Sequence, residues 1–154
     1  MYGLFEREYP KCEKSLFLIA LTYLHNTEDA RDVLQEAALA AYSSMHTLRH
    51  EEYFKTWLTR ILINKCKNFL RAKRPTEELR DDIGLFCEVP ETELEIVDAI
   101  CRMKQESAVY ISLRFYNEMN YQQVSKALKQ PVSTVKYRTR KALEELRSLL
   151  GGDV

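Results

Sequence analysis

Apolar residues recur every three or four positions along most of this chain, and that spacing restricts what it can fold into. Such a period places apolar side chains on one face of an α-helix, whereas a β-strand requires strict alternation. No convincing alternating segment is present, so the sequence predicts an all-α protein. The densest apolar stretch, Leu16–Leu24, is too short to cross a membrane and predicts a buried helix without membrane insertion.

The helical period is lost once, and this interruption divides the chain into two units. Helices in the first unit are predicted over residues 4–24, 27–44 and 54–72, with Pro10 at a helix start or a break. Helices in the second unit are predicted over residues 91–103, 106–116, 121–128 and 133–150. We therefore predict two small helical domains, residues 1–74 and 91–154, joined by an acidic linker at residues 75–90.

Charge is segregated along the chain, although 23 basic and 23 acidic residues give a net charge of zero. Residues 54–75 contain seven basic groups and no acidic group, and residues 107–154 contain eight basic and four acidic groups. Residues 1–53 and 76–106 have net charges of −4 and −7. Two basic segments separated by an acidic one predict two nucleic-acid-binding surfaces and a linker that nucleic acid repels.

The segment 121–143 has the pattern of a helix-turn-helix. A two-turn amphipathic helix is followed by a tight turn at residues 129–131, and Ser133 or Thr134 is expected to cap the next helix. The apolar stripe of that helix directs long hydrogen-bond donors away from the core, as expected of a helix that enters the major groove. The predicted DNA-binding residues are Ser133, Thr134, Lys136, Tyr137, Arg138, Arg140 and Lys141. The alternative is a solvated, charged face on a terminal helix.

The helix at residues 54–72 is the second candidate DNA-binding surface. Opposite its apolar stripe, one aromatic residue, one amide and three cations recur at intervals of three and four. These residues are Trp57, Arg60, Asn64, Lys67 and Arg71. Cations that follow phosphates, combined with a planar group that stacks on bases, predict binding of single-stranded DNA. The alternative is a core tryptophan with solubilising cations, and the absence of acids over residues 54–75 argues against it.

An acidic helix precedes this segment and predicts a protein-docking surface. Asn26 or Thr27 can cap the helix, with acids in its first turn. Asp32, Gln35 and Glu36 lie at positions i, i+3 and i+4, opposite the apolar stripe. Their oxygens can accept bidentate hydrogen bonds from arginine on a partner helix. The alternative is an acidic face that only contacts water.

The remaining chemistry-bearing residues form no recognisable catalytic or metal-binding pattern. The four cysteines are far apart, with no CxxC pair and no histidine at a zinc-like spacing, so we interpret them as buried or neutral thiols. There is no phosphate-binding glycine loop and no nucleophile–base pair. We therefore expect no cofactor and no enzymatic activity. The N-terminus lacks the pattern of a signal peptide, and we expect a cytoplasmic protein.

The order of these features resembles the bacterial RNA polymerase sigma factors of the extracytoplasmic-function (ECF) group, in the sigma-70 superfamily. The likeness rests on EDARDVLQEA (28–37), FKTWLTRILINKCKNFLR (54–71) and LRFYNEMNYQQVSKALKQPVSTVKYRTRKAL (113–143). It covers nearly the whole chain, and the three segments are specific in combination. The resemblance implies a region-two domain at residues 1–74 and a region-four domain at residues 91–154.

The resemblance also implies a function, a transcription initiation factor that binds core RNA polymerase and directs it to promoters. It implies that Asp32, Gln35 and Glu36 contact the clamp helices of the largest polymerase subunit, with the flap as a further contact. It implies that the helix at 54–71 and the loop at 43–53 capture the unwound minus-ten element, and that Lys136, Tyr137, Arg140 and Lys141 face the minus-thirty-five element. An anti-sigma protein that masks the docking surfaces is implied as well.

Some residues depart from the family pattern. Where housekeeping sigma factors have two adjacent aromatic residues that separate the strands, this chain has Thr56 and Trp57, which predicts weaker melting and dependence on a good promoter. Lys129 and Tyr137 also differ from the usual residues, so the promoter sequence is the least transferable implication. Two alternatives remain open: a helix-turn-helix regulator that does not recruit polymerase, and a sigma-like decoy that acts through protein interaction.

Overall fold

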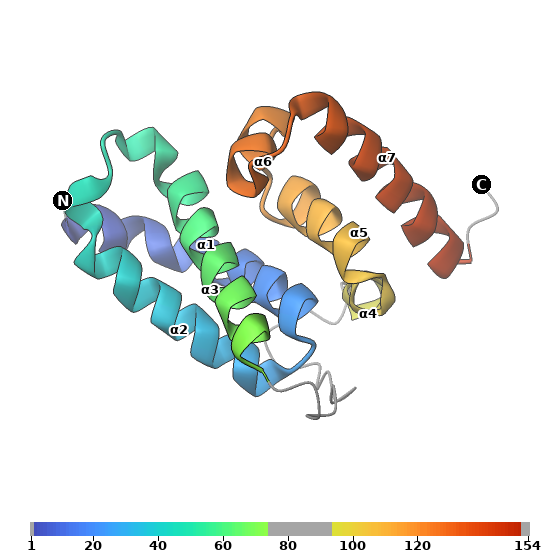
Figure 1. Ribbon diagram of the computed structural model, residues 1–154, viewed down its shortest axis with the longest axis horizontal. Coiled ribbons are helices and arrows are strands. Elements are labelled where there is room, and N and C mark those ends of the chain that lie inside the picture. Colours follow the sequence, from blue (N-terminus) through green and yellow to red (C-terminus); the bar gives the residue numbers. More distant parts are fainter. Residues whose placement is uncertain (1, 74–93, 152–154) are drawn as a thin grey trace.

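The computed structural model describes residues 2–73 and 94–151 of the chain. Its helices in chain order are α1 (Tyr2–Leu24), α2 (Thr27–Ser43), η1 (Met45–Thr47), η2 (Glu51–Tyr53), α3 (Phe54–Ala72), α4 (Leu94–Arg102), α5 (Gln105–Ile111), η4 (Ser112–Tyr116), α6 (Tyr121–Leu128) and α7 (Val132–Leu149). The described residues contain no strand, which confirms the predicted all-α class (Figure 1). The predicted linker at residues 75–90 lies outside them, so the domain boundaries stay a prediction.

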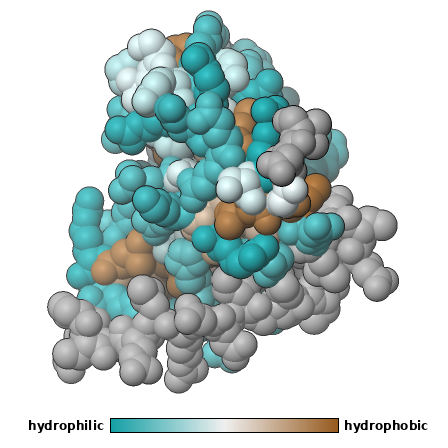
Figure 2. Space-filling view, turned by 90° about the vertical axis from the view of Figure 1, so that its right-hand side faces the viewer, coloured by the Kyte–Doolittle hydropathy of each residue, from teal (hydrophilic) through white to brown (hydrophobic). Residues whose placement is uncertain are grey.

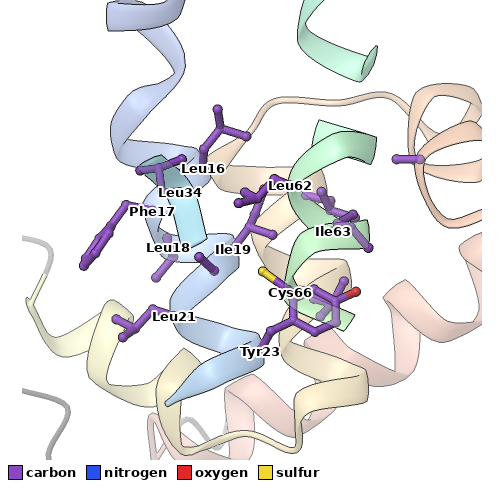
Figure 3. Packing of buried hydrophobic residues seen from close by; sticks show 14 of the residues in the cluster. Leu16, Phe17, Leu18, Ile19, Leu21, Tyr23, Leu34, Leu62, Ile63 and Cys66 are labelled. Atoms are coloured by element: carbon purple, nitrogen blue, oxygen red, sulfur yellow. The ribbon is translucent and has the colours of Figure 1, made fainter. Parts of the chain in front are cut away.

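Helices α1, α2 and α3 pack pairwise against one another and form the N-terminal bundle (Figure 1). Every residue of α1 from Leu16 to Leu24 is buried, because this half of the helix has neighbours on all sides. Figure 3 shows its side chains between Leu34 of α2 and Leu62 of α3. The described residues include no helix with the length and apolar character needed to span a membrane.

Local sequence determines where these helices begin and continue. Asn26 caps α2, because its side-chain oxygen accepts a 2.9 Å hydrogen bond from the backbone N–H of Asp29. Pro10 lies inside α1, which is one continuous helix and not two. A proline there removes one backbone hydrogen bond. The burial of Leu4 and Cys12 on either side holds both segments in the same core.

The helix-turn-helix consists of α6 and α7, and its turn differs in one respect from the prediction. Asn120 and Gln123 form a reciprocal capping box at the start of α6, and Lys129, directly after this helix, adopts the left-handed conformation, with φ 56° and ψ 50°. Capping of α7 by Ser133 or Thr134 was wrong. Pro131 occupies the cap position with φ −60°, so α7 begins at Val132 and both residues lie within its first turn.

The C-terminal helices pack directly on the N-terminal bundle, and the hydrophobic core is continuous between them. Helix α1 contacts α5 and η4, and α3 contacts α6. Helix α3 also has a second buried stripe beside its predicted one, formed by Thr59, Ile63 and Cys66. Figure 1 shows α5 and α6 between α3 and α7.

Candidate docking and nucleic-acid interfaces

The acidic face, which we define as Asp32, Gln35 and Glu36, lies on the exposed side of α2. The opposite side of the helix is anchored in the core by buried residues that include Ala30, Leu34 and Ala37. Within residues 2–73 and 94–151, no ion pair engages Asp32 or Glu36. Both carboxylates are therefore available to a cationic partner, as the sequence predicted.

The sequence did not predict that a leucine beside the acidic face is exposed. Leu39 is 64% exposed and follows Asp32 by seven residues, which places it on the same side of α2. Tyr42, one turn further, is also exposed, and its ring lies 4.8 Å from that of Tyr2. The helical period alone could have found Leu39, because it interrupts an otherwise polar face. A large apolar side chain among carboxylates is typical of a protein-binding surface.

The basic face of α3, which we define as Arg60, Asn64, Lys67 and Arg71, is exposed along its whole length. No carboxylate of the described residues forms an ion pair with its three cations. The strip therefore retains its full positive charge, which favours binding to the phosphates of nucleic acid. The structure brings the four predicted residues together on one side of a single rigid helix.

Trp57 occupies a position between the core and this basic face. Its ring is half-buried and lies 6.0 Å from that of Phe54, so part of it packs in the bundle. Its other side lines a groove of about 430 Å³. Leu48, Arg60 and residues of α6, including Lys126, also line this groove. The tryptophan therefore belongs partly to the core and partly to the candidate DNA surface.

The predicted DNA-binding residues of α7 differ in what they already contact. Tyr137 is 56% exposed, and Arg140 is exposed without a charged or aromatic partner among the described residues. Lys141 lies 5.7 Å from the Tyr137 ring centroid and 3.7 Å from a Glu144 carboxylate oxygen. Lys136 lies 5.8 Å from the ring centroid of Tyr121. These side chains make only contacts at the protein surface, and DNA could replace those contacts.

Arg138 is directed back toward its own domain. Its guanidinium donates a 3.5 Å hydrogen bond to the Tyr110 hydroxyl, and both residues line a cavity of about 140 Å³ together with Lys67 of α3. Ser133 is exposed and Thr134 is half-buried in the first turn of α7. Figure 2 shows the side of the molecule nearest α7. The surface there is mostly hydrophilic, with small hydrophobic patches.

The three cysteines that the structure describes have the environment of structural thiols. Cys12, Cys66 and Cys101 are free and buried, and burial raises the pKa of the Cys66 thiol to about 12 and that of Cys101 to about 11. Figure 3 shows the Cys66 sulfur beside the Tyr23 ring. A protonated buried thiol is a poor nucleophile and a poor metal ligand. No group of three metal-ligating side chains occurs in the part of the chain that the structure describes.

A helix-turn-helix with exposed cations, combined with a bundle that has separate acidic and basic faces, defines a helical DNA-binding protein with a surface for a protein partner. Residues 9–76 match the family described as Sigma-70 region 2, and residues 102–148 match Sigma-70, region 4. The chain is 31% identical to the ECF RNA polymerase sigma-E factor of Haemophilus influenzae, over 83% of this chain and 78% of that protein. It belongs to the ECF group of the sigma-70 family, whose members are transcription initiation factors.

Other relatives and solved structures agree with this assignment. The sigma factor SigV of Bacillus subtilis is 26% identical over 88% of this chain and 84% of its own length. The fold is similar to that of the sigma factor RpoE of Bartonella quintana, solved in complex with the anti-sigma factor NepR. The TM-score is 0.78 at 20% identity, and the match covers 97% of this chain and 98% of that one.

Proposed function

We infer that this chain initiates transcription by joining core RNA polymerase to promoter DNA through three separate surfaces. The observation that supports this most directly is the pairing of α2 and α3. These adjacent helices of one bundle share a core, but the acidic face of one and the basic face of the other present opposite charges to solvent. A negative surface suits a basic protein partner and a positive one suits DNA, so a single domain can hold both at once.

The acidic face of α2 is the proposed docking site for core polymerase. Asp32, Gln35 and Glu36 would accept hydrogen bonds from basic residues of the clamp helices of the largest subunit, and Leu39 would add apolar contact. The C-terminal domain would contact the polymerase flap. Because the Bartonella relative was solved with an anti-sigma factor, we propose a protein of this kind as a competitor for these surfaces.

The two basic surfaces are the proposed DNA-binding sites. Arg60, Lys67 and Arg71 would follow the phosphates of the unwound minus-ten element while Trp57 contacts a base. Helix α7 would enter the major groove of the minus-thirty-five element with Tyr137 and Arg140 toward the base edges. The chain would supply recognition and strand capture, and nucleotide chemistry would belong to the polymerase.

Transcription in vitro tests this proposal directly. The full chain is added to core polymerase with a library of templates randomised around the two promoter elements, and the transcripts are sequenced. We expect initiation to depend on this chain and the selected templates to share two conserved blocks. A regulator that does not recruit polymerase would produce no transcripts, and a decoy with an inactive DNA surface would select no sequence.

A further inference from the structure

The groove beside Trp57 has the size and composition of a small-molecule site. Its volume of about 430 Å³ lies in the range typical of ligand pockets. One wall is formed by the start of α3 and the loop before it, and the other by α6, which contacts α3 (Figure 1). We call it the α3–α6 groove. Its main residues are Arg49, Trp57 and Arg60 on the first wall and Gln123 and Lys126 on the second.

The cations Arg49, Arg60 and Lys126 line this groove, and each is exposed. Among the described residues that line it, none is acidic. Within residues 2–73 and 94–151, no ion pair engages any of the three cations. A cleft lined by charge of one sign concentrates ions of the opposite sign. The groove therefore favours an anionic ligand.

Two aromatic rings lie at the same groove. Trp57 is half-buried, and its ring rests 6.0 Å from that of Phe54, which holds it in place while its other side lines the groove. Tyr53 is 49% exposed, and its ring centroid lies 5.4 Å from the Lys126 ammonium. A held indole beside cations offers a stacking surface to a planar ring that carries negative charge.

The capping box of α6 determines what the second wall offers to a ligand. Asn120 Oδ1 accepts a 2.8 Å hydrogen bond from the backbone N–H of Gln123, and Gln123 Oε1 accepts a 2.9 Å hydrogen bond from that of Asn120. These bonds orient both amides, and their NH₂ groups can still donate. Both residues line the groove at the N-terminal, positive end of α6. This wall therefore favours ligands rich in hydrogen-bond acceptors.

The combination of these features discriminates between classes of ligand. An inorganic anion would satisfy the cations but leave Trp57 uncovered, and an uncharged aromatic compound would leave the cations without a counterion. A nucleotide matches both, because its base can stack and its phosphates carry the charge. Among the bases, guanine presents two adjacent acceptors, N7 and O6, to a wall of donors.

We propose that the α3–α6 groove binds a free nucleoside polyphosphate, with the base against Trp57 and the phosphates among Arg49, Arg60 and Lys126. Both halves of the molecule contribute to the site, so neither half alone contains all of it. Trp57 and Arg60 also belong to the proposed minus-ten surface. Competition between the nucleotide and a DNA strand therefore rests on the proposed function, whereas nucleotide binding itself does not.

Tryptophan fluorescence of the full chain, without polymerase or DNA, tests this proposal with GTP as the probe. Trp57 is the only tryptophan in the sequence, so its emission reports on this groove alone. We expect GTP to change the emission along a saturable curve, with an affinity that falls as salt is raised. Guanosine lacks the phosphates and should need a concentration at least about 10-fold higher.

Lys126→Gln should weaken GTP binding about 10-fold, because a charge-assisted contact to a phosphate is lost. Lys129→Gln is the matched control. Lys129 directly follows α6, is exposed and lies outside the groove, so this variant has the same net charge and should bind GTP like wild type. Arg49→Gln provides an independent test from the first wall and should weaken GTP binding to a similar extent. Circular dichroism establishes that each variant keeps its helices.

Two outcomes would overturn the nucleotide site. One is the absence of a saturable response to GTP, including the case in which only a short single-stranded oligonucleotide changes the emission. The other is equal GTP affinity in the folded Lys126→Gln, Arg49→Gln and Lys129→Gln chains. Because the titration contains neither polymerase nor promoter, a chain that initiates transcription yet gives either result keeps its proposed function and loses this site.

Discussion

Helices α2 and α3 have the same place in the fold and opposite surfaces. Each buries an apolar stripe in one bundle. Among the described residues, no ion pair engages Asp32 or Glu36 of the acidic face or the three cations of the basic face. An exposed leucine, Leu39, lies beside the acidic face of α2, whereas the basic face of α3 consists of three cations and one amide. The two faces therefore suit different partners, because protein surfaces offer apolar contact and a phosphate backbone offers charge.

We expect from this comparison that neither face contributes much to the stability of the fold. Solvated like charges on one helix contribute little to stability or weaken it slightly. Charges of one sign on an exposed face are expected where a binding partner supplies the opposite charge. Changes confined to one face should therefore remove one interaction and leave the fold and the other interaction intact.

Charge reversal on α2 should have the largest effect. The variant Asp32→Lys, Glu36→Lys should weaken binding to core polymerase at least about 100-fold, because cations would then face basic residues of the partner. Affinity is measured by titrating labelled chain with core polymerase. The control Glu95→Lys, Asp98→Lys adds the same charge to α4 and should leave affinity unchanged. Equal losses in both variants would show that net charge alone drives docking.

Removal of cations from α3 should affect DNA and leave polymerase binding unchanged. Arg60→Ala, Lys67→Ala should weaken binding of the assembled holoenzyme to a single-stranded minus-ten probe and reduce the slope of log affinity against log salt by about 0.7 per cation. Lys11→Ala, Lys14→Ala removes two exposed cations of α1 and should leave that slope unchanged. An unchanged slope for the α3 variant would mean that these cations only solubilise the helix.

The sequence predicted most of the fold because helical period, capping and turn residues act locally. It predicted the tight turn after α6 and the exposed face of α7, both of which follow from a few neighbouring residues. It missed the second buried stripe of α3, because Thr59 and Cys66 are not strongly apolar and are covered by residues far away in sequence, including Asn117 at Thr59 and Tyr23 at Cys66. Packing between segments far apart in sequence leaves no such periodic signal.

The same distinction explains what was missed in the candidate site. Exposed polar residues were recognised from their spacing, but Leu39 required knowledge of which neighbours cover α2 and which leave it open. The start of α7 was misplaced by one residue because Pro131, and not a hydroxyl side chain, occupies the cap. The different environments of Arg138 and Arg140 depend on Tyr110, which is distant in sequence and bonds only to Arg138 of the two.

Helix α7 offers a similar comparison between two arginines. Arg140 is exposed, whereas Arg138 forms a hydrogen bond to Tyr110. Arg140→Ala should weaken binding to the minus-thirty-five duplex by about 1–3 kcal/mol if the side chain contacts a base. Arg138→Ala should have a smaller effect on DNA affinity and should lower the free energy of unfolding slightly, because its guanidinium bonds to Tyr110. Fluorescence anisotropy with duplex DNA and thermal unfolding measure the two effects. The reverse order would assign Arg138 to base recognition.

Leu39→Ala tests whether the acidic face differs from the basic face in more than sign. Because the leucine is 64% exposed, its removal should barely change stability, and alanine is at least as good a helix former. Burial of this side chain against polymerase would contribute about 1–2 kcal/mol, so core affinity should fall roughly 5- to 30-fold. Unlike the effect of charge reversal, this loss should persist at high salt, because apolar contact is not screened.

Ile96→Ala is the matched control, since it removes an exposed aliphatic side chain from α4, outside the acidic face. Core affinity at low and high salt should be unchanged in this variant. If Leu39→Ala also left affinity unchanged, docking through α2 would be purely electrostatic, and the two faces would differ only in the sign of their charge. A loss for Leu39→Ala that disappears at high salt would contradict a direct apolar contact and indicate that the substitution acts through the neighbouring carboxylates.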